Sequence, residues 1–117
     1  MMQGSCHCGK VRLTITRITD TATECNCSLC RRYAPLWGYL TESEVGIESE
    51  RLEEYAHGDR MIRFQRCPGC GCITHYRSVS PGAENRLAVN YRMFAPEILQ
   101  QVRIRHFDGA DSWQYLE

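Results

Sequence analysis

The placement of eight cysteines constrains this chain of 117 residues more than any other feature. They fall in three tight groups: Cys6 and Cys8; Cys25, Cys27 and Cys30; Cys67, Cys70 and Cys72. Such clustering is typical of metal sites, because unligated buried thiols would be scattered along the chain. We therefore expect a zinc protein in which seven of the cysteines hold metal at two sites.

The rest of the composition narrows the class of protein. The first ten residues contain no basic region followed by an apolar run, so we expect no signal peptide. No segment approaches the roughly 18 apolar residues of a membrane span. We expect a cytoplasmic protein with reduced thiols, since disulfides, the main alternative, suit an exported domain. Equal numbers of basic and acidic residues, 14 of each, argue against a nucleic-acid partner.

The chain length suits one zinc-binding domain spanning residues 1–117, with a small core that metal would help to stabilise. Short alternating or apolar segments predict strands near residues 10–16, 36–40, 51–55, 61–65, 73–77, 87–91 and 102–107. Many short strands separated by turns predict an all-β fold of sheets packed face to face, with little helix.

Two local patterns predict short helices, and one predicts the direction of a side chain. The segment from Thr41 to Glu44 has capping-box spacing, although a plain polar turn is an equal alternative. Pro96 begins a second candidate helix. In the last strand His106 alternates with Val102 and Ile104, so we expect its side chain to point inward, most often as a hydrogen-bonded core residue.

The first and third cysteine groups predict a closed structural site. Cys67 and Cys70 form a Cys-x-x-Cys turn with glycine, which presents both sulfurs to one ion. A structural zinc needs four ligands, and Cys6 and Cys8 are the natural partners. Their pairing would join the N-terminus to the middle of the chain, although spacing alone leaves the pairing open.

The middle group predicts a second site with a different purpose. Cys25, Cys27 and Cys30 offer three thiols within six residues, and three protein ligands with a free fourth position are expected of a catalytic zinc. We therefore expect these three residues to be catalytic. Alternatively, a fourth protein ligand makes this a second structural site. The candidates are Cys72 first, then His7, His57, His75 and His106.

Three thiolates leave zinc with a net charge near minus one, which makes it a poor activator of water. Such an ion suits a soft ligand, so we expect an incoming thiol that attacks a small electrophile or is released from its adduct. Arg31 and Arg32 could pair with a substrate carboxylate. Trp113 could form a pocket wall with Trp37 and Tyr39, with ordinary core packing as the alternative.

These motifs, read together, resemble a known family. Three segments carry the resemblance: Gly4–Val11, Cys25–Arg32 and Arg66–Gly71. Their order, internal spacing and separation closely resemble the glutathione-dependent formaldehyde-activating enzyme family, which also includes centromere protein V. The resemblance covers nearly the whole chain.

The resemblance implies an Mss4-like fold of antiparallel sheets. It also implies a structural zinc on Cys6, Cys8, Cys67 and Cys70, and a second zinc on Cys25, Cys27 and Cys30. The implied activity is that of a carbon–sulfur lyase that interconverts S-hydroxymethylglutathione with glutathione and formaldehyde. A small-molecule thiol is then the expected partner. The alternative is a non-enzymatic module for protein interaction, with both metals structural. Iron or copper would also suit thiolate sites.

Overall fold

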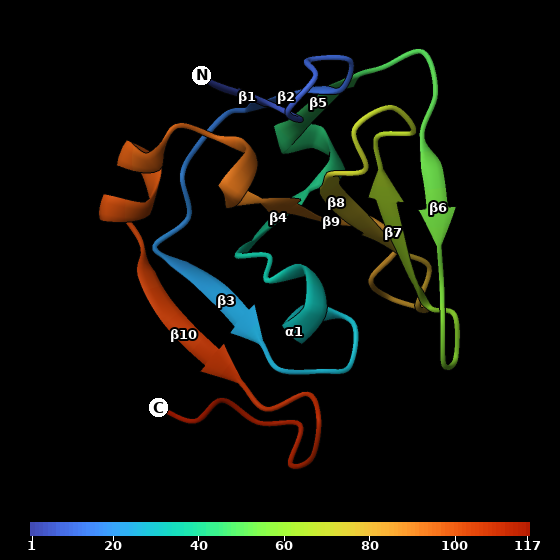
Figure 1. Ribbon diagram of the computed structural model, residues 1–117. Helices are drawn as coiled ribbons and strands as arrows, with labels where there is room; N and C mark the ends of the chain where they lie inside the picture. Colours follow the sequence, from blue (N-terminus) through green and yellow to red (C-terminus); the bar gives the residue numbers. More distant parts are fainter.

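The computed structural model describes residues 1–117 and consists of two β-sheets joined by short helices and loops (Figure 1). The smaller sheet has the strand order β1-β2-β5, and the larger has the order β10-β3-β4-β9-β8-β7-β6. The strands are β1 Met2–Ser5, β2 Arg12–Ile15, β3 Thr21–Cys25, β4 Trp37–Thr41, β5 Val45–Glu48, β6 Glu53–Tyr55, β7 Ile62–Arg66, β8 Ile73–Ser78, β9 Arg86–Asn90 and β10 Arg103–Phe107. The all-β, Mss4-like prediction is confirmed.

Helices are short, as expected. They are α1 Cys30–Tyr33 and the 3₁₀ helices η1 Glu42–Glu44, η2 Tyr91–Met93 and η3 Pro96–Gln100. The capping box at η1 is present, with the Thr41 backbone N–H donating to Glu44 Oε1 at 3.0 Å. Pro96 begins η3, where its missing N–H is not needed. None of these helices has the length and hydropathy that crossing a membrane requires.

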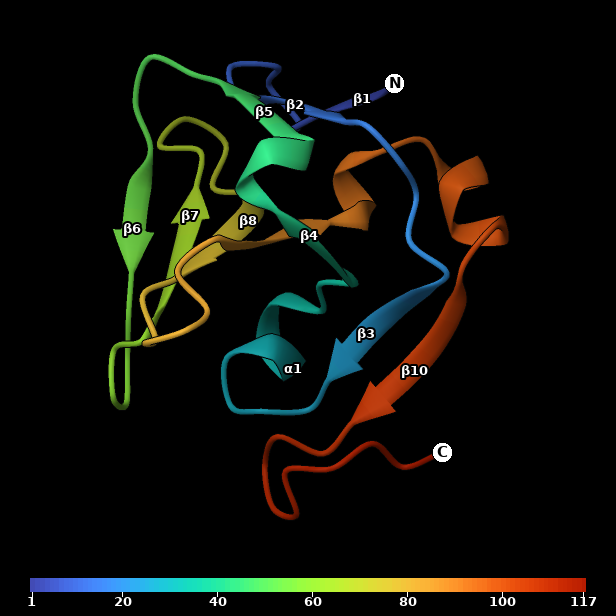
Figure 2. The ribbon, with the colours of Figure 1, turned by 180° about the vertical axis from the view of Figure 1, so that it is seen from behind.

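One strand pair departs from the antiparallel arrangement and positions the site. β10 runs parallel to β3, with Phe107 in register with Cys25. Figures 1 and 2 show the two strands side by side with their arrowheads at the same end. The chain segments that follow them, residues 26–30 and 108–113, therefore leave the sheet at the same edge. The parallel pair thus brings the middle cysteine group against the C-terminal segment.

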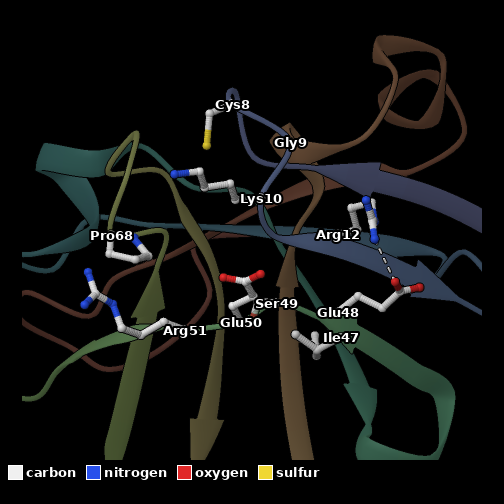
Figure 3. A pocket seen from close by; sticks show the side chains of 10 residues that line it. All are labelled: Cys8, Gly9, Lys10, Arg12, Ile47, Glu48, Ser49, Glu50, Arg51 and Pro68. Carbon is white, nitrogen blue, oxygen red and sulfur yellow. Dashed lines mark hydrogen bonds and ion pairs between the residues drawn. The ribbon is translucent and has the colours of Figure 1, made fainter.

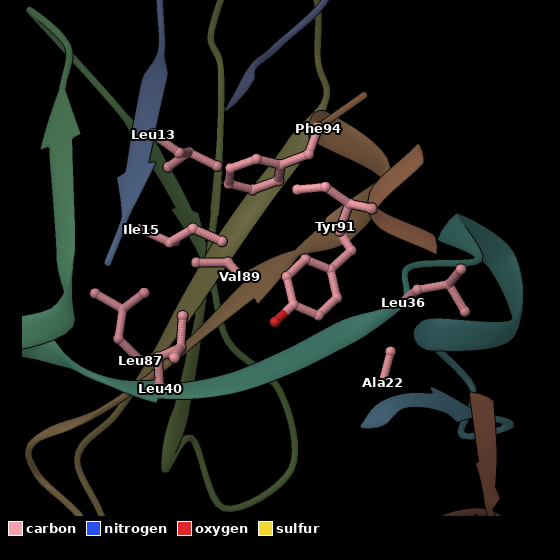
Figure 4. Close-up of a cluster of buried hydrophobic side chains, with 10 residues drawn as sticks. Leu13, Ile15, Ala22, Leu36, Leu40, Leu87, Val89, Tyr91 and Phe94 are labelled. Carbon is pink, nitrogen blue, oxygen red and sulfur yellow. The ribbon is translucent and has the colours of Figure 1, made fainter. Parts of the chain in front are cut away.

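The first hydrophobic core lies between the two sheets (Figure 4). On β2, Leu13 and Ile15 are fully buried, as the alternation predicted. They pack against Leu40 of β4 and Leu87 and Val89 of β9. Since aliphatic side chains from both sheets interlock here, burial of apolar surface fixes the position of one sheet on the other.

The opposite face of the larger sheet carries a second core that is mainly aromatic. Its buried members are Cys30, Trp37, Phe64, Ile73, Tyr76 and Ala88. The ring centroids of Trp37 and Tyr76 lie 4.8 Å apart at an edge-to-face angle of 75°. Cys30 belongs to this core, so the middle cysteine group rests directly on the aromatic face of the sheet.

The prediction that His106 points inward is wrong. Half of its side-chain surface is exposed, and its Nε2 lies 3.0 Å from Glu24 Oε2. Its Nδ1 contacts the carboxylate of Glu117. The reason is that the chain continues past β10 and folds back, so that Tyr115 covers the Phe107 side of the strand. The apolar face at this end of β10 is therefore the other one.

Candidate metal centres

Four thiols from two segments that are far apart in the sequence lie close together in the structure. The Sγ atoms of Cys6, Cys8, Cys67 and Cys70 all lie within 4.8 Å of one another. The Sγ of Cys8 is 3.7 Å from that of Cys6 and 3.5 Å from that of Cys67. A tetrahedral zinc with bonds of ~2.3 Å separates its sulfur ligands by about 3.8 Å. The spacing of this four-thiol cluster therefore fits one zinc ion.

Backbone amides surround the four-thiol cluster. Val11 N donates to Cys6 Sγ at 3.3 Å, and Gly69 N donates to Cys67 Sγ at 3.3 Å. Gly71 adopts a φ of 81°, which favours glycine, and this closes the turn through Gly71 N to Cys67 O at 2.9 Å. Backbone N–H donation from Cys72 lowers the pKa of Cys70 to about 5. These donors favour the thiolate form that metal binding requires.

The middle group forms a second cluster from one short segment. The Sγ atoms of Cys25, Cys27 and Cys30 also lie within 4.8 Å of one another. Cys25 ends β3 and Cys30 begins α1, so the chain turns tightly between them. Cys27 N donates to Cys25 Sγ and Cys30 N donates to Cys27 Sγ, both at 3.4 Å. The local turn alone therefore directs the three sulfurs toward one point.

The acid–base properties of this three-thiol cluster also suit a cation. A hydrogen bond with the Cys30 thiol lowers the pKa of Cys25 to about 6, and the backbone amides of Cys27 and Gly109 act in the same direction. The same contact with Cys25, followed by burial, raises the pKa of Cys30. One thiolate is thus stable near neutral pH, and a bound cation would favour release of the remaining protons.

The C-terminal segment completes the three-thiol cluster. A Cβ atom on Gly109 would lie 2.7 Å from Cys25 Sγ, so only glycine allows this close approach. Asn26 holds the segment in place: its Nδ2 donates to Asp108 Oδ1, and Ala110 N donates to its Oδ1, both at 3.0 Å. Sequence reasoning missed Gly109 and Asp108, because no local pattern links them to the cysteine segment around Asn26, which lies 82 residues before Asp108.

A cavity of about 830 Å³ opens beside the three-thiol cluster. Of its 20 lining residues 12 are hydrophobic, and all three cysteines are among the lining. Trp37, Tyr39 and Trp113 line it as well, so the structure places the predicted aromatic wall at this cavity. A mostly apolar cavity with some polar groups in its lining is typical of a small-molecule site.

The candidate fourth ligands do not join the three-thiol cluster. Cys72 lies beside Cys70 and Cys6 of the other cluster, next to the backbone of His7. His75 is fully buried in β8 with Nδ1 2.8 Å from Thr74 Oγ1, and burial lowers its pKa to about 4. His57, on the turn between β6 and β7, lines the same cavity as the three thiols.

The two arginines of α1 have different environments. Arg31 lines the cavity, where its guanidinium could meet an anionic group of a ligand. Arg32 instead donates from Nη1 to the carbonyl oxygen of Ser28 at 2.6 Å and supports the turn. Only Arg31 therefore suits the predicted contact with a carboxylate.

A second cavity, of about 990 Å³, lies beside the four-thiol cluster (Figure 3). Its lining is polar and carries both signs of charge. Arg12 and Glu48 form an ion pair in its wall at 2.8 Å, and Lys10 and Glu50 belong to the same lining. Cys8 contributes the one thiol in its wall. This cavity lacks both an apolar floor and a group of thiols. The cavity beside Cys25 is therefore the better candidate for a ligand-binding site.

Comparisons with known proteins support this interpretation of the clusters. The family model described as "Glutathione-dependent formaldehyde-activating enzyme" matches residues 1–105. A crystal structure of a protein from Rhodobacter sphaeroides is similar, with 28% sequence identity and a TM-score of 0.72 over 88% of this chain and 99% of that chain. No curated protein matches the chain. The family match includes both clusters and ends just before the segment that contains Gly109.

Proposed function

The chain belongs to the glutathione-dependent formaldehyde-activating enzyme family, and on this premise we propose that it is a zinc-dependent carbon–sulfur lyase acting on S-hydroxymethylglutathione or a similar thiol–aldehyde adduct. The observation that carries the proposal is the placement of three clustered thiols in the wall of a large apolar cavity. The four-thiol cluster has no comparable cavity floor, so we assign it a structural role.

The donor sets of both clusters fit zinc, which prefers thiolate sulfur in tetrahedral sites. Cys6, Cys8, Cys67 and Cys70 would hold one ion, and Cys25, Cys27 and Cys30 the other. When bound at the three thiols, zinc offers a position for a further soft ligand, such as the sulfur of a substrate. Side chains and backbone groups of the chain would orient the substrate and exclude water.

The backbone amides of Cys27 and Cys30 hold the sulfurs in a fixed arrangement, so little reorganisation accompanies ligand binding. The apolar wall excludes water from the adduct, and Arg31 can orient a substrate carboxylate. In the lyase direction the C–S bond breaks with its electron pair on sulfur. The hydroxyl oxygen forms the carbonyl and gives its proton to water or to the departing thiolate.

The direct test measures exchange between formaldehyde, glutathione and their adduct by NMR, with protein loaded with two equivalents of zinc. We expect faster exchange than without protein, and loss of this effect in Cys27→Ser. The Cys72→Ser variant is the matched control, because Cys72 lies outside both clusters. Unchanged exchange rates in zinc-loaded wild-type protein, with this and with other thiols, would reject the lyase proposal.

A second candidate function is a zinc module for protein interaction, and one observation favours it. Trp113 and Leu116 in the C-terminal tail are exposed over 67% and 65% of their surfaces. Contiguous exposed apolar patches are typical of contact surfaces, and these two side chains could contribute to one. This candidate function predicts that the protein does not accelerate exchange of the adduct and that neither bound metal binds an added thiol. Three expectations stay predictions: that the metal is zinc, that the protein is cytoplasmic, and that residues 1–117 form a single domain.

A further inference from the structure

We infer that the cavity beside the three-thiol cluster selects an adduct whose thiol carries an aromatic or similarly flat, apolar group, and that Trp113 determines this selectivity. The inference rests on the proposed lyase function and specifies its substrate class. It is carried by the aromatic floor of the cavity and by the exposed indole of Trp113.

The floor of the cavity is an aromatic surface built by the larger sheet. Trp37, Phe64 and Tyr76 come from adjacent or nearby strands β4, β7 and β8. Their ring centroids lie 4.8 to 6.1 Å apart in tilted and edge-to-face arrangements. Aromatic rings prefer such contacts with one another. A flat apolar group entering the cavity would extend this packing, whereas a peptide would lose water from its amides against it.

Trp113 belongs to the lining of the same cavity and comes from the C-terminal segment. Its ring packs edge-to-face on Phe107 at 5.1 Å, yet 67% of the residue stays exposed. Its φ of 61° lies in the left-handed region, which bulky residues rarely adopt. Asp108 holds it there, accepting at its backbone oxygen from Trp113 N at 2.7 Å and at Oδ2 from Ser112 N and Oγ. A large indole held in an unfavourable conformation at a cavity is a candidate ligand contact.

The polar side chains of the lining surround the aromatic floor and are not part of it: they include Ser28, Arg31, His57, Asp59 and Arg86, which lie in turns, in α1 or at the start of β9. Both functional groups of the Asn26 amide already bond to the C-terminal segment. The guanidinium of Arg86 lies over the Tyr39 ring at 5.8 Å. Arg31 can donate hydrogen bonds to one carboxylate at the edge of this floor. Against the floor itself the peptide amides of glutathione would lose hydration without gaining a partner, whereas a flat apolar group would lose little.

The test compares benzyl mercaptan with glutathione by isothermal titration calorimetry on the zinc-loaded protein. We expect benzyl mercaptan to bind at least about tenfold more tightly. Trp113→Ala should weaken benzyl mercaptan about tenfold and change glutathione by less than about twofold. Leu116→Ala is the matched control, because Leu116 lies in the same tail, is equally exposed and does not line the cavity. It should leave both affinities unchanged.

A second arm uses benzyl alcohol, which lacks sulfur and therefore reports on the cavity without the metal. We expect saturable NMR shifts of the indole N–H signals of Trp37 and Trp113. Saturation by benzyl alcohol with no thiol binding would reject the lyase proposal but keep the aromatic selectivity of the cavity. Equal or tighter binding of glutathione, or unchanged benzyl mercaptan affinity in a folded Trp113→Ala variant, would overturn the inference and leave the lyase proposal standing.

Discussion

The two cysteine clusters use the same ligand type but differ in what they connect. The four-thiol cluster joins segments 59 residues apart, and its Cys6 and Cys67 are buried. The three-thiol cluster lies within one turn between β3 and α1, beside a cavity and under the C-terminal segment. One cluster closes a long loop, whereas the other offers its sulfurs to a ligand.

This difference shows that the sequence separation between the ligands of a metal site affects how much the site stabilises the fold. A cross-link between distant residues restricts the unfolded chain much more than one within a short turn. Loss of the four-thiol cluster should therefore unfold the protein. Loss of the three-thiol cluster should remove ligand binding while the two sheets keep their shared aliphatic core.

The largest effect is expected for Cys67→Ser, which breaks the closed cluster at a fully buried position. We expect the free energy of unfolding to fall by roughly 5 kcal/mol or more, enough to unfold most of the protein. Circular dichroism and thermal unfolding of zinc-loaded protein measure this change. The control Cys72→Ser should cost less than about 1 kcal/mol. A folded Cys67→Ser protein with an unchanged melting temperature would show that this cluster is not the main cross-link.

The next largest effect is expected for Cys27→Ser in the three-thiol cluster. We expect zinc content to fall from about two ions per chain to about one, with a loss of stability near 2 kcal/mol. Metal analysis and thermal unfolding measure both quantities. If this variant unfolds as completely as Cys67→Ser, the contrast between the two clusters is wrong.

Gly109→Ala should have a smaller effect that is confined to the three-thiol cluster. The added Cβ would lie 2.7 Å from Cys25 Sγ and 3.3 Å from Cys27 Cβ, so the C-terminal segment must move away. We expect about 1 kcal/mol of destabilisation and a roughly tenfold weaker second zinc, measured by competition with a chelator. Gly46→Ala is the control, because its nearest atom is 3.8 Å away. Equal zinc affinity in the two variants would contradict the assigned role of Gly109.

The smallest effect is expected for the stability of the C-terminal tail beside the three-thiol cluster, which should depend on pH. Glu117 raises the pKa of His106 above 6.5. The stabilisation that protonated His106 gives the folded tail is therefore present at low pH and is lost as pH rises through the raised pKa. His106 lowers the pKa of Glu117 below 4.5, so that contribution is lost as pH falls through the lowered value. The tail should therefore be held best between about pH 5 and 6.5.

The amide signal of Leu116, which donates to His106 O at 2.9 Å, reports this equilibrium by NMR. Glu117→Gln should remove the pH dependence of the Leu116 signal, while the signal of Val11 beside the closed cluster stays unchanged. A Leu116 signal that titrates identically in both proteins would show that the His106–Glu117 contact does not hold the tail.

Much of the fold could be predicted because its signals are local. The alternation around Leu13 and Ile15 predicted β2, and the capping box predicted η1. The cysteine spacings predicted the groups that the structure brings together. The strands β1, β3 and β5 were missed, because short segments with mixed side chains carry no clear period. The helix α1 was missed because it is a single turn within the cysteine segment.

The surroundings of the three-thiol cluster could not be predicted in the same way. The alternation of β10 predicted the wrong face for His106, because the returning tail covers the Phe107 side. The contact between Asn26 and Asp108 joins residues 82 positions apart and depends on the parallel pairing of β3 with β10. A single sequence contains no periodic signal for such pairing.

The sequence by itself determined the three local groups of cysteines, since a thiolate turn directs its sulfurs through bonds and amides within a few residues. The tertiary structure alone decided that one cluster closes a 59-residue separation while the other borders an aromatic cavity under Gly109. The physical reason is range. Turn geometry acts between neighbours in the chain, whereas cavities form where distant strands and tails pack together.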